Sequence, residues 1–333
     1  MAKGYNPTEY MYSSARLRAL ETRIATRERI RQMADAPSAN AVISQLSDFG
    51  FEMTQGAEAV SRERMLESVL VNGYGELASM ECADAIAFMR YPYDANNIKA
   101  IIKCAARGVS PDSMLSTLGS VSIDDAKNAF AQKDYSAFSK NISAAVLEAE
   151  DAFAATSNPQ QIDFIVDRAC FADMLESAEN SGIELAVALV RAKIDIVNIM
   201  MTLRVIKMNL GNMALAILSD AYIGGGSYEK EQLAEALGGG EEALAQLISR
   251  GAYESVSTAI LNSWTLGEME KLADDLWFSI ARGAKYVSFG AEIAIGYVVA
   301  LEYEVKNVRI ILAGKDAGLS AEVIRERLRD CYA

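Results

Sequence analysis

The sequence predicts an all-helical protein. Apolar residues recur at steps of three and four over long stretches, which is the spacing of one helix face, and no sustained apolar-polar alternation indicates a strand. After Pro159 the chain contains no proline, so long helices can run there uninterrupted. With 333 residues, 51% hydrophobic and 23% charged, the chain can bury a large core, which excludes wholesale disorder.

The first predicted helical region carries a run of arginines. Two acids, Glu21 and Glu28, are interleaved with them, which favours a solvated helix face over a contact with another protein, the alternative. The arginines are Arg16, Arg18, Arg23, Arg27, Arg29 and Arg31.

Two long helices are predicted after Pro159, separated by glycine clusters at residues 224–226 and 238–240 that indicate turns. The apolar seam of the first is Ile183, Val187, Val190, Ile194, Val197 and Met201. The second is expected over about residues 284–313, roughly 45 Å at 1.5 Å per residue. Its apolar stripe is Phe289, Ile293, Tyr297, Leu301, Val305, Val308 and Leu312. Glu292, Glu302, Lys306 and Arg309 fall on its wetter side.

A short polar motif recurs three times along the chain. Each copy has an acid, an Asn three residues later and an aliphatic residue directly after the Asn, so its members are neighbours on one helix face. The asparagines lie 101 residues apart (97 to 198) and then 109 residues apart (198 to 307). Such repetition predicts three related helical units.

The residues that follow the motif set the predicted boundaries of these units. Gly108 and Gly318 each lie 11 residues after the Asn of their copy. If Gly226-Ser227 is their equivalent in the middle copy, that copy has an insertion of 16 residues, of which residues 213–223 are apolar enough to extend the helix. The predicted units are residues 1–110, residues 111–226 with the insertion near 211–226, and residues 227–333.

Two interpretations of the motif are open. In the structural one, each Asn satisfies backbone groups of a neighbouring helix end while the acid pairs with a base. In the functional one, the motifs face a central cavity, an interdomain seam or a partner protein. The candidate residues are Arg90, Asp94, Asn97, Lys99, Asp195, Asn198, Glu304, Asn307 and Arg309.

No catalytic, cofactor-binding or metal-binding residues are predicted. The chain has no histidine, which removes the Ser-His and Cys-His nucleophiles and the usual zinc and di-iron sites. Gly314-Lys315 lacks the first glycine and the hydroxyl residue of a phosphate-binding loop, and Asp274-Asp275 lacks the third carboxylate of a magnesium cluster. Four widely spaced cysteines indicate buried, reduced thiols. A net charge of −13 disfavours nucleic-acid binding.

Near both ends, the chain resembles the C-type subunits of bacterial and archaeal A/V-type ATPases, which are similar to the d-type subunit of the eukaryotic vacuolar proton pump. The N-terminal residues that carry the resemblance are Tyr12, Ala15, Arg16, Arg18, Leu20 and Glu21, and Asp94 with Asn97, Ile98 and Lys99 fits the first internal motif. The C-terminal residues are Phe289, Gly290, Glu292, Tyr297, Ala300, Glu304, Asn307, Val308, Arg309, Leu312, Lys315, Gly318, Leu319, Glu322, Arg325, Leu328 and Tyr332. The middle copy departs most, with its insertion and with Met200 where the other copies have Lys99 and Arg309.

The resemblance implies a funnel of three similar helical domains around a pseudo-threefold axis. It implies a non-catalytic rotor socket on the cytoplasmic face of the membrane, peripheral and without membrane insertion. Its partners would be central-stalk subunits of the D and F type and the proteolipid of the rotor ring. The socket would couple ATP hydrolysis or synthesis to ion transport, and whether protons or sodium ions move stays open because the ring carries the ion-binding carboxylates.

Two other functions are alternatives to the socket. A helical scaffold or adaptor unrelated to the rotary ATPase would predict a shorter repeat, of about 35 to 45 residues, with atypical capping units. An all-helical enzyme is disfavoured by the missing histidines and the incomplete carboxylate cluster.

Overall fold

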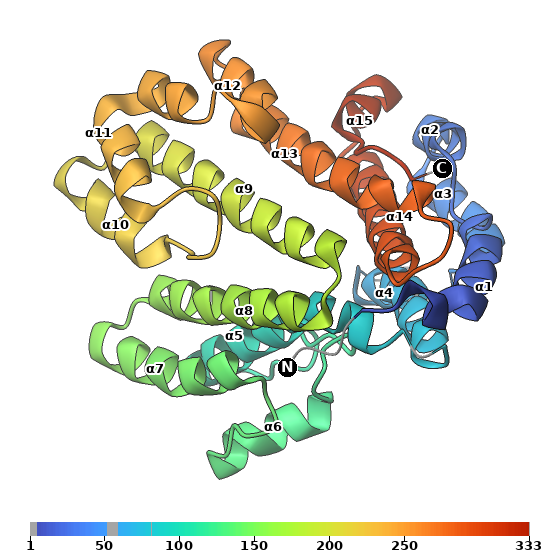
Figure 1. Cartoon of the computed structure of the whole chain (residues 1–333), viewed down its shortest axis with the longest axis horizontal. Coiled ribbons are helices and arrows are strands. Elements are labelled where there is room, and N and C mark those ends of the chain that lie inside the picture. Colours follow the sequence, from blue (N-terminus) through green and yellow to red (C-terminus); the bar gives the residue numbers. More distant parts are fainter. Residues whose placement is uncertain (1–4, 52–58, 81, 333) are drawn as a thin grey trace. The chain divides into compact units, whose positions relative to one another are not determined.

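Every regular element in the described residues is a helix, as the sequence predicts. The computed structural model describes residues 5–51, 59–80 and 82–332 (Figure 1). The α-helices are α1 (Met11–Glu21), α2 (Arg27–Asp35), α3 (Ala39–Leu46), α4 (Ala59–Ala78), α5 (Tyr91–Arg107), α6 (Ile123–Gln132), α7 (Lys140–Thr156), α8 (Pro159–Ser181), α9 (Glu184–Met208), α10 (Ala214–Ala221), α11 (Lys230–Leu247), α12 (Glu254–Leu261), α13 (Leu266–Ala281), α14 (Glu292–Asp316) and α15 (Ala321–Arg327). Short 3₁₀ helices are η1 (Pro7–Tyr10), η2 (Ser47–Phe49), η3 (Asp84–Met89), η4 (Gly211–Met213), η5 (Gly251–Tyr253) and η6 (Arg282–Tyr286).

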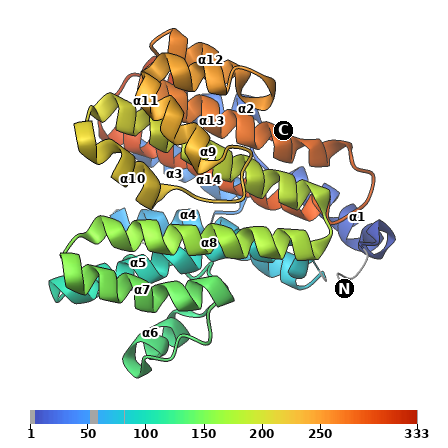
Figure 2. The same cartoon turned by 60° about the vertical axis from the view of Figure 1, so that its left-hand side comes forward.

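One compact unit is Ala87–Ala273, within which α8 and α9 are the central helices. α8 packs against α5, α7 and α9, and α9 also packs against α10 and α11. Figures 1 and 2 show α7 running alongside α8. The residues of α9 are buried on nearly every side, from Ala186 to Val205, which is expected of a helix that is apolar all round.

The other compact unit combines Gly4–Ile86 with Asp274–Ala333. Its centre is α14, which packs against α1, α2, α3, α4, α15 and η6. From Ile293 to Leu301 every residue of α14 is buried. The three predicted sequence repeats concern a different property from these two compact units, and their boundaries at residues 110 and 226 stay a prediction.

The long helices differ from the sequence prediction at one end each. Residues 213–223 do not extend α9, because Asn209 adopts a left-handed conformation that ends the helix and Ala214–Ala221 then forms the separate α10. The last long helix begins at Glu292 rather than near residue 284, because Arg282–Tyr286 is a 3₁₀ helix that continues into extended backbone at Val287. Phe289 therefore lies outside α14 and is 39% exposed.

Candidate functional site

The three motif asparagines occupy equivalent positions on three helices. Asn97 on α5 and Asn198 on α9 lie ten residues before the last residue of their helix, and Asn307 on α14 lies nine before. Each of the three side chains is at most 2% exposed. The residue 11 positions after each Asn has a positive φ: Gly108 at 66°, Asn209 at 49° and Gly318 at 68°. The middle helix thus ends in register with the other two, with Asn in place of Gly.

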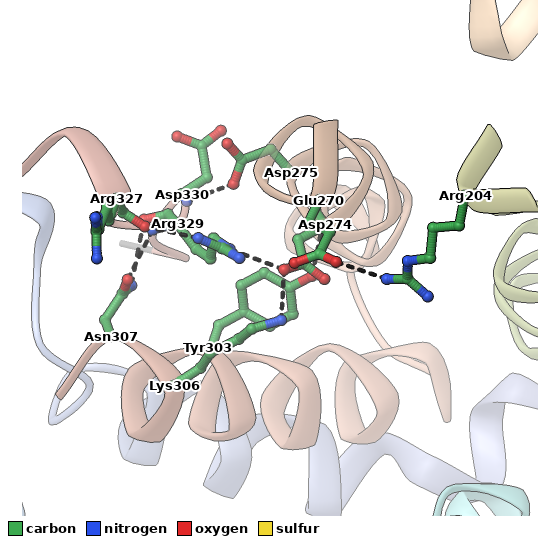
Figure 3. A network of polar contacts seen from close by, with 10 residues as sticks. All are labelled: Arg204, Glu270, Asp274, Asp275, Tyr303, Lys306, Asn307, Arg327, Arg329 and Asp330. Carbon is green, nitrogen blue, oxygen red and sulfur yellow. Dashed lines mark hydrogen bonds and ion pairs between the residues drawn. The ribbon is translucent and has the colours of Figure 1, made fainter. Parts of the chain in front are cut away.

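Each asparagine binds both backbone groups of one residue farther along the chain, an arrangement called the amide clamp below. Asn97 donates from Nδ2 to the Ser116 carbonyl at 2.9 Å and accepts from the Ser116 N–H at 2.8 Å. Asn198 does the same with Ile223, at 2.7 and 3.0 Å. Asn307 holds Arg329 at 3.2 and 2.8 Å, as Figure 3 shows. The primary amide matches a backbone N–H and C=O, so it replaces a strand partner for an irregular segment.

The acids of the first two copies hold a segment four residues beyond the clamp. Asp94 accepts from the backbone N–H groups of Ser120 at 3.0 Å and Val121 at 3.1 Å, and from the Ser120 hydroxyl. Asp195 accepts from the Ser227 N–H at 2.6 Å and from the Tyr253 hydroxyl at 2.9 Å. Burial raises the pKa of Asp94, while its bonds to Ser120 and Val121 and the nearby Arg90 oppose that rise.

A glycine precedes the held serine in both copies for a steric reason. A Cβ atom on Gly119 would clash with Oδ1 of Asp94, and a Cβ atom on Gly226 would clash with Oδ1 of Asp195. Gly-Ser at residues 119–120 is therefore the structural equivalent of Gly-Ser at residues 226–227.

This equivalence corrects the size of the middle insertion. The clamp spans 19 residues in the first copy and 25 in the second, and the acid-to-serine bond spans 26 and 32, so the second copy is longer by six residues rather than 16. The sequence pattern alone matches Ser227 with Ser110, which is exposed and bonds to Asp112 instead. The repeated Gly-Ser pair was the signal that could have given the correct match.

The acid of the third copy is bound differently. Glu304 is 4% exposed, and its Oε1 accepts one hydrogen bond, from the Ala25 N–H at 2.7 Å. No group in the described residues hydrogen-bonds to its buried Oε2. Burial raises the pKa of Glu304 to about 7, and the bond from Ala25 opposes that rise.

The predicted basic residues lie beside these motifs and have partners within the chain. Arg90 donates from Nε to the Leu118 carbonyl at 3.0 Å and also bonds to the Gly119 carbonyl, next to the segment that Asp94 holds. Lys99 forms an ion pair with Asp167 of α8 at 2.7 Å. Arg309 forms one with Glu63 of α4 at 2.8 Å. The structure thus gathers the nine candidates into three separate sets, each tied to its own segment. A contact with a partner protein by any of them stays a prediction.

A second polar network, on α13, was not predicted as a site. Asp274 accepts from Lys306 at 2.5 Å and from Arg329 Nε at 2.8 Å, and its carbonyl accepts from the Tyr303 hydroxyl at 2.6 Å (Figure 3). Asp275 accepts from the Asp330 N–H at 2.8 Å. The paired acids that resemble part of a metal cluster in the sequence therefore fix residues 329–330. The described residues contain no group of three or more side chains placed to hold a metal ion.

Comparison with known proteins identifies relatives of this helical arrangement. The model of the family described as "ATP synthase (C/AC39) subunit" matches residues 13–327. A similar curated protein is the C-type subunit of the V-type sodium ATPase of Enterococcus hirae. It is 24% identical over 246 residues, which cover 73% of this chain and 74% of that protein.

Proposed function

The chain belongs to the family of C/AC39 subunits of ATP synthases, and from this premise we propose that it is a non-catalytic rotor socket of an A/V-type ATPase. In this role it links the central stalk to the membrane rotor ring and couples ATP hydrolysis or synthesis to ion transport. It is placed at the cytoplasmic face of the membrane as a peripheral part of the complex. None of the described helices combines the length and the apolar character needed to cross a membrane.

The observation that carries this proposal is the extent of the family match. The matched residues, 13–327, include α5, α9 and α14 and all three motifs, so the match concerns the whole helical framework rather than one segment. The likeness to the C-type component of a V-type sodium ATPase supports the same role, over about three quarters of each chain.

The amide clamps suit a part that transmits torque. A coupler must deform little under load, and close-packed helical cores are stiff. Between helices, however, irregular segments are the compliant parts of a fold. Here Asn97, Asn198 and Asn307 tie three such segments to the central helices through buried bonds. Stiffness is thereby extended beyond the helices themselves.

The proposed partners are central-stalk subunits of the D and F type and the proteolipid of the rotor ring. We further propose that the three sequence repeats form three similar domains around a pseudo-threefold axis, as a funnel. The like surroundings of the three asparagines support the repeat.

Removing this chain from the assembled ATPase tests the function. We expect complexes that lack it to retain ATP hydrolysis and to lose ATP-driven ion transport, because coupling rather than catalysis is removed. Ion uptake into vesicles and phosphate release are measured on the same preparation, and adding back the purified chain is the control. Normal transport without the chain would contradict the proposal. Failure of the chain to associate with any other ATPase component would favour the helical scaffold instead.

A further inference from the structure

Glu304 is a buried carboxyl group that lacks the partners of its two counterparts. Both oxygens of Asp94 and of Asp195 accept hydrogen bonds. Glu304 holds only the Ala25 N–H, and its Oε2 is buried without a hydrogen-bond partner among the described residues. Ala25 directly precedes Thr26, the N-cap of α2, so this single bond ties the start of α2 to α14.

Within the described part of the chain, no cation pairs with Glu304. The titratable groups closest in effect are Tyr297 on α14 and Cys331 after α15, and burial raises the pKa of Tyr297 to about 12 and of Cys331 to about 11, so both are neutral near pH 7. Arg23, between α1 and α2, lies near Tyr297 but does not hydrogen-bond to Glu304.

Other charged groups on the elements around α14 are engaged elsewhere. α3 carries no ionisable side chain. The pairs are Arg16 with Glu76, Arg18 with Glu21, Arg27 and Arg282 with Asp330, and Arg325 with Asp35. Lys285 of η6 donates to the Tyr332 carbonyl.

Ionisation of Glu304 would therefore place an uncompensated charge in the core. One backbone N–H does not offset the loss of water around a carboxylate, whereas an uncharged carboxyl with one unsatisfied hydroxyl costs much less. The neutral form still accepts at Oε1 from Ala25. The bond is thus compatible with the protonated group and the burial is not compatible with the ionised one.

We propose that Glu304 is a proton-dependent latch, whose uncharged carboxyl holds residue 25 and the start of α2 against α14 and whose ionisation loosens that contact. The latch is a property of this unit alone and does not depend on the proposed rotor function. Because the pKa of Glu304 is raised in the folded protein, the stabilisation is complete below the ordinary Glu pKa of about 4.5 and is lost as the pH rises through about 7.

Hydrogen exchange of the full chain between pH 5.5 and 8.5 tests the latch. We expect protection of residues 24–35, corrected for intrinsic exchange rates, to fall by about tenfold or more in the wild type, as a pKa shift of one unit changes an equilibrium tenfold. Glu304→Gln removes the titration, so its protection should stay nearly constant and exceed that of the wild type at pH 8.5. The same pH dependence in the variant and the wild type would overturn the proposal.

A matched variant at a counterpart site separates a latch from an ordinary buried acceptor. Asp195→Asn neutralises an acid whose oxygens accept from Ser227 and Tyr253, so it should lower protection near residue 227 at every pH. If Glu304→Gln lowers protection of residues 24–35 in the same pH-independent way, the latch is wrong. A ¹³C NMR titration of the Glu304 carboxyl gives a second readout: a midpoint near 7 supports the proposal and one near 4.5 overturns it.

Discussion

The amide clamp is the same on all three long helices, whereas the acid three residues before it is not. On α5 and α9 an aspartate holds a serine four residues beyond the clamped residue, at Ser120 and Ser227. On α14 a glutamate holds Ala25, which lies 279 residues earlier in the chain. The difference teaches that the asparagine meets a constant requirement of the fold, while the acid is fitted to whichever segment lies beside it.

The first two acids are also fully bonded, and the third is not. A small aspartate against a glycine leaves room for both oxygens to meet backbone N–H groups or hydroxyls. The longer Glu304 reaches one N–H and leaves the other oxygen without a partner among the described residues. Helices that look alike in sequence can therefore differ in how their stability responds to pH.

The largest effect is expected where the clamp itself is removed. Asn198→Leu deletes both bonds to Ile223 and leaves its buried N–H and C=O unsatisfied, at about 1–3 kcal/mol for each group. We expect the free energy of unfolding to fall by about 2–6 kcal/mol, measured by urea denaturation. The control is Asn128→Leu, on α6, whose loss should be about 0.5 kcal/mol or less because the residue lies outside the buried face of that helix.

Equal losses in Asn97→Leu and Asn307→Leu would sharpen the comparison, since they would show that the clamp contributes alike in all three copies. An Asn198→Leu variant as stable as the Asn128→Leu control would break it, because the clamp would then be a geometric coincidence.

A smaller loss is expected when the glycine beside the acid is filled. In Gly226→Ala the new methyl group collides with Asp195, and such crowding in a packed site costs about 1–3 kcal/mol. Gly224→Ala is the matched control, because a Cβ atom there has nothing within 4 Å. Thermal unfolding of both variants measures the difference. If Gly226→Ala unfolds at the temperature of Gly224→Ala, Gly-Ser is not part of the motif.

Periodicity was sufficient to predict the fold class and the two longest helices, because an apolar face at helical spacing has few other uses. It failed at helix ends. The left-handed cap at Asn209 breaks α9 within an apolar sequence, and the 3₁₀ turn at Arg282–Tyr286 delays α14. Both depend on backbone conformations that apolar spacing does not encode.

The motif positions were also predictable, since an acid and an amide on an otherwise apolar face must find partners when buried. Their partners were not predictable. Ser116, Ile223 and Arg329 share no residue type, because the clamp binds only backbone atoms. Ala25 could not be assigned to Glu304 because the contact joins distant parts of the chain.

The smallest effect on stability is expected at the ion pairs beside the first and third motifs. Both side chains of the Arg309–Glu63 pair are at least half exposed, whereas Lys99 of the Lys99–Asp167 pair is 16% exposed. Exposed pairs contribute about 0–1 kcal/mol, so Arg309→Glu should lower stability by no more than about that amount and Lys99→Glu by somewhat more. Chemical denaturation of each variant measures this order.

The same variants decide whether these bases act within the chain or on a partner protein. We expect at least one reversal among Arg90→Glu, Lys99→Glu and Arg309→Glu to lower ATP-driven ion transport while ATP hydrolysis persists. Exchanging the charges, as in Arg309→Glu with Glu63→Arg, restores the internal pair but not an external contact. Recovery of transport in the exchanged variant would assign the effect to the ion pair. A continued deficit would assign it to a partner surface, because the internal interaction has been returned. If all three reversals fold and transport ions at the wild-type rate, these bases are ordinary surface charges, and only the buried acids and amides distinguish the motif.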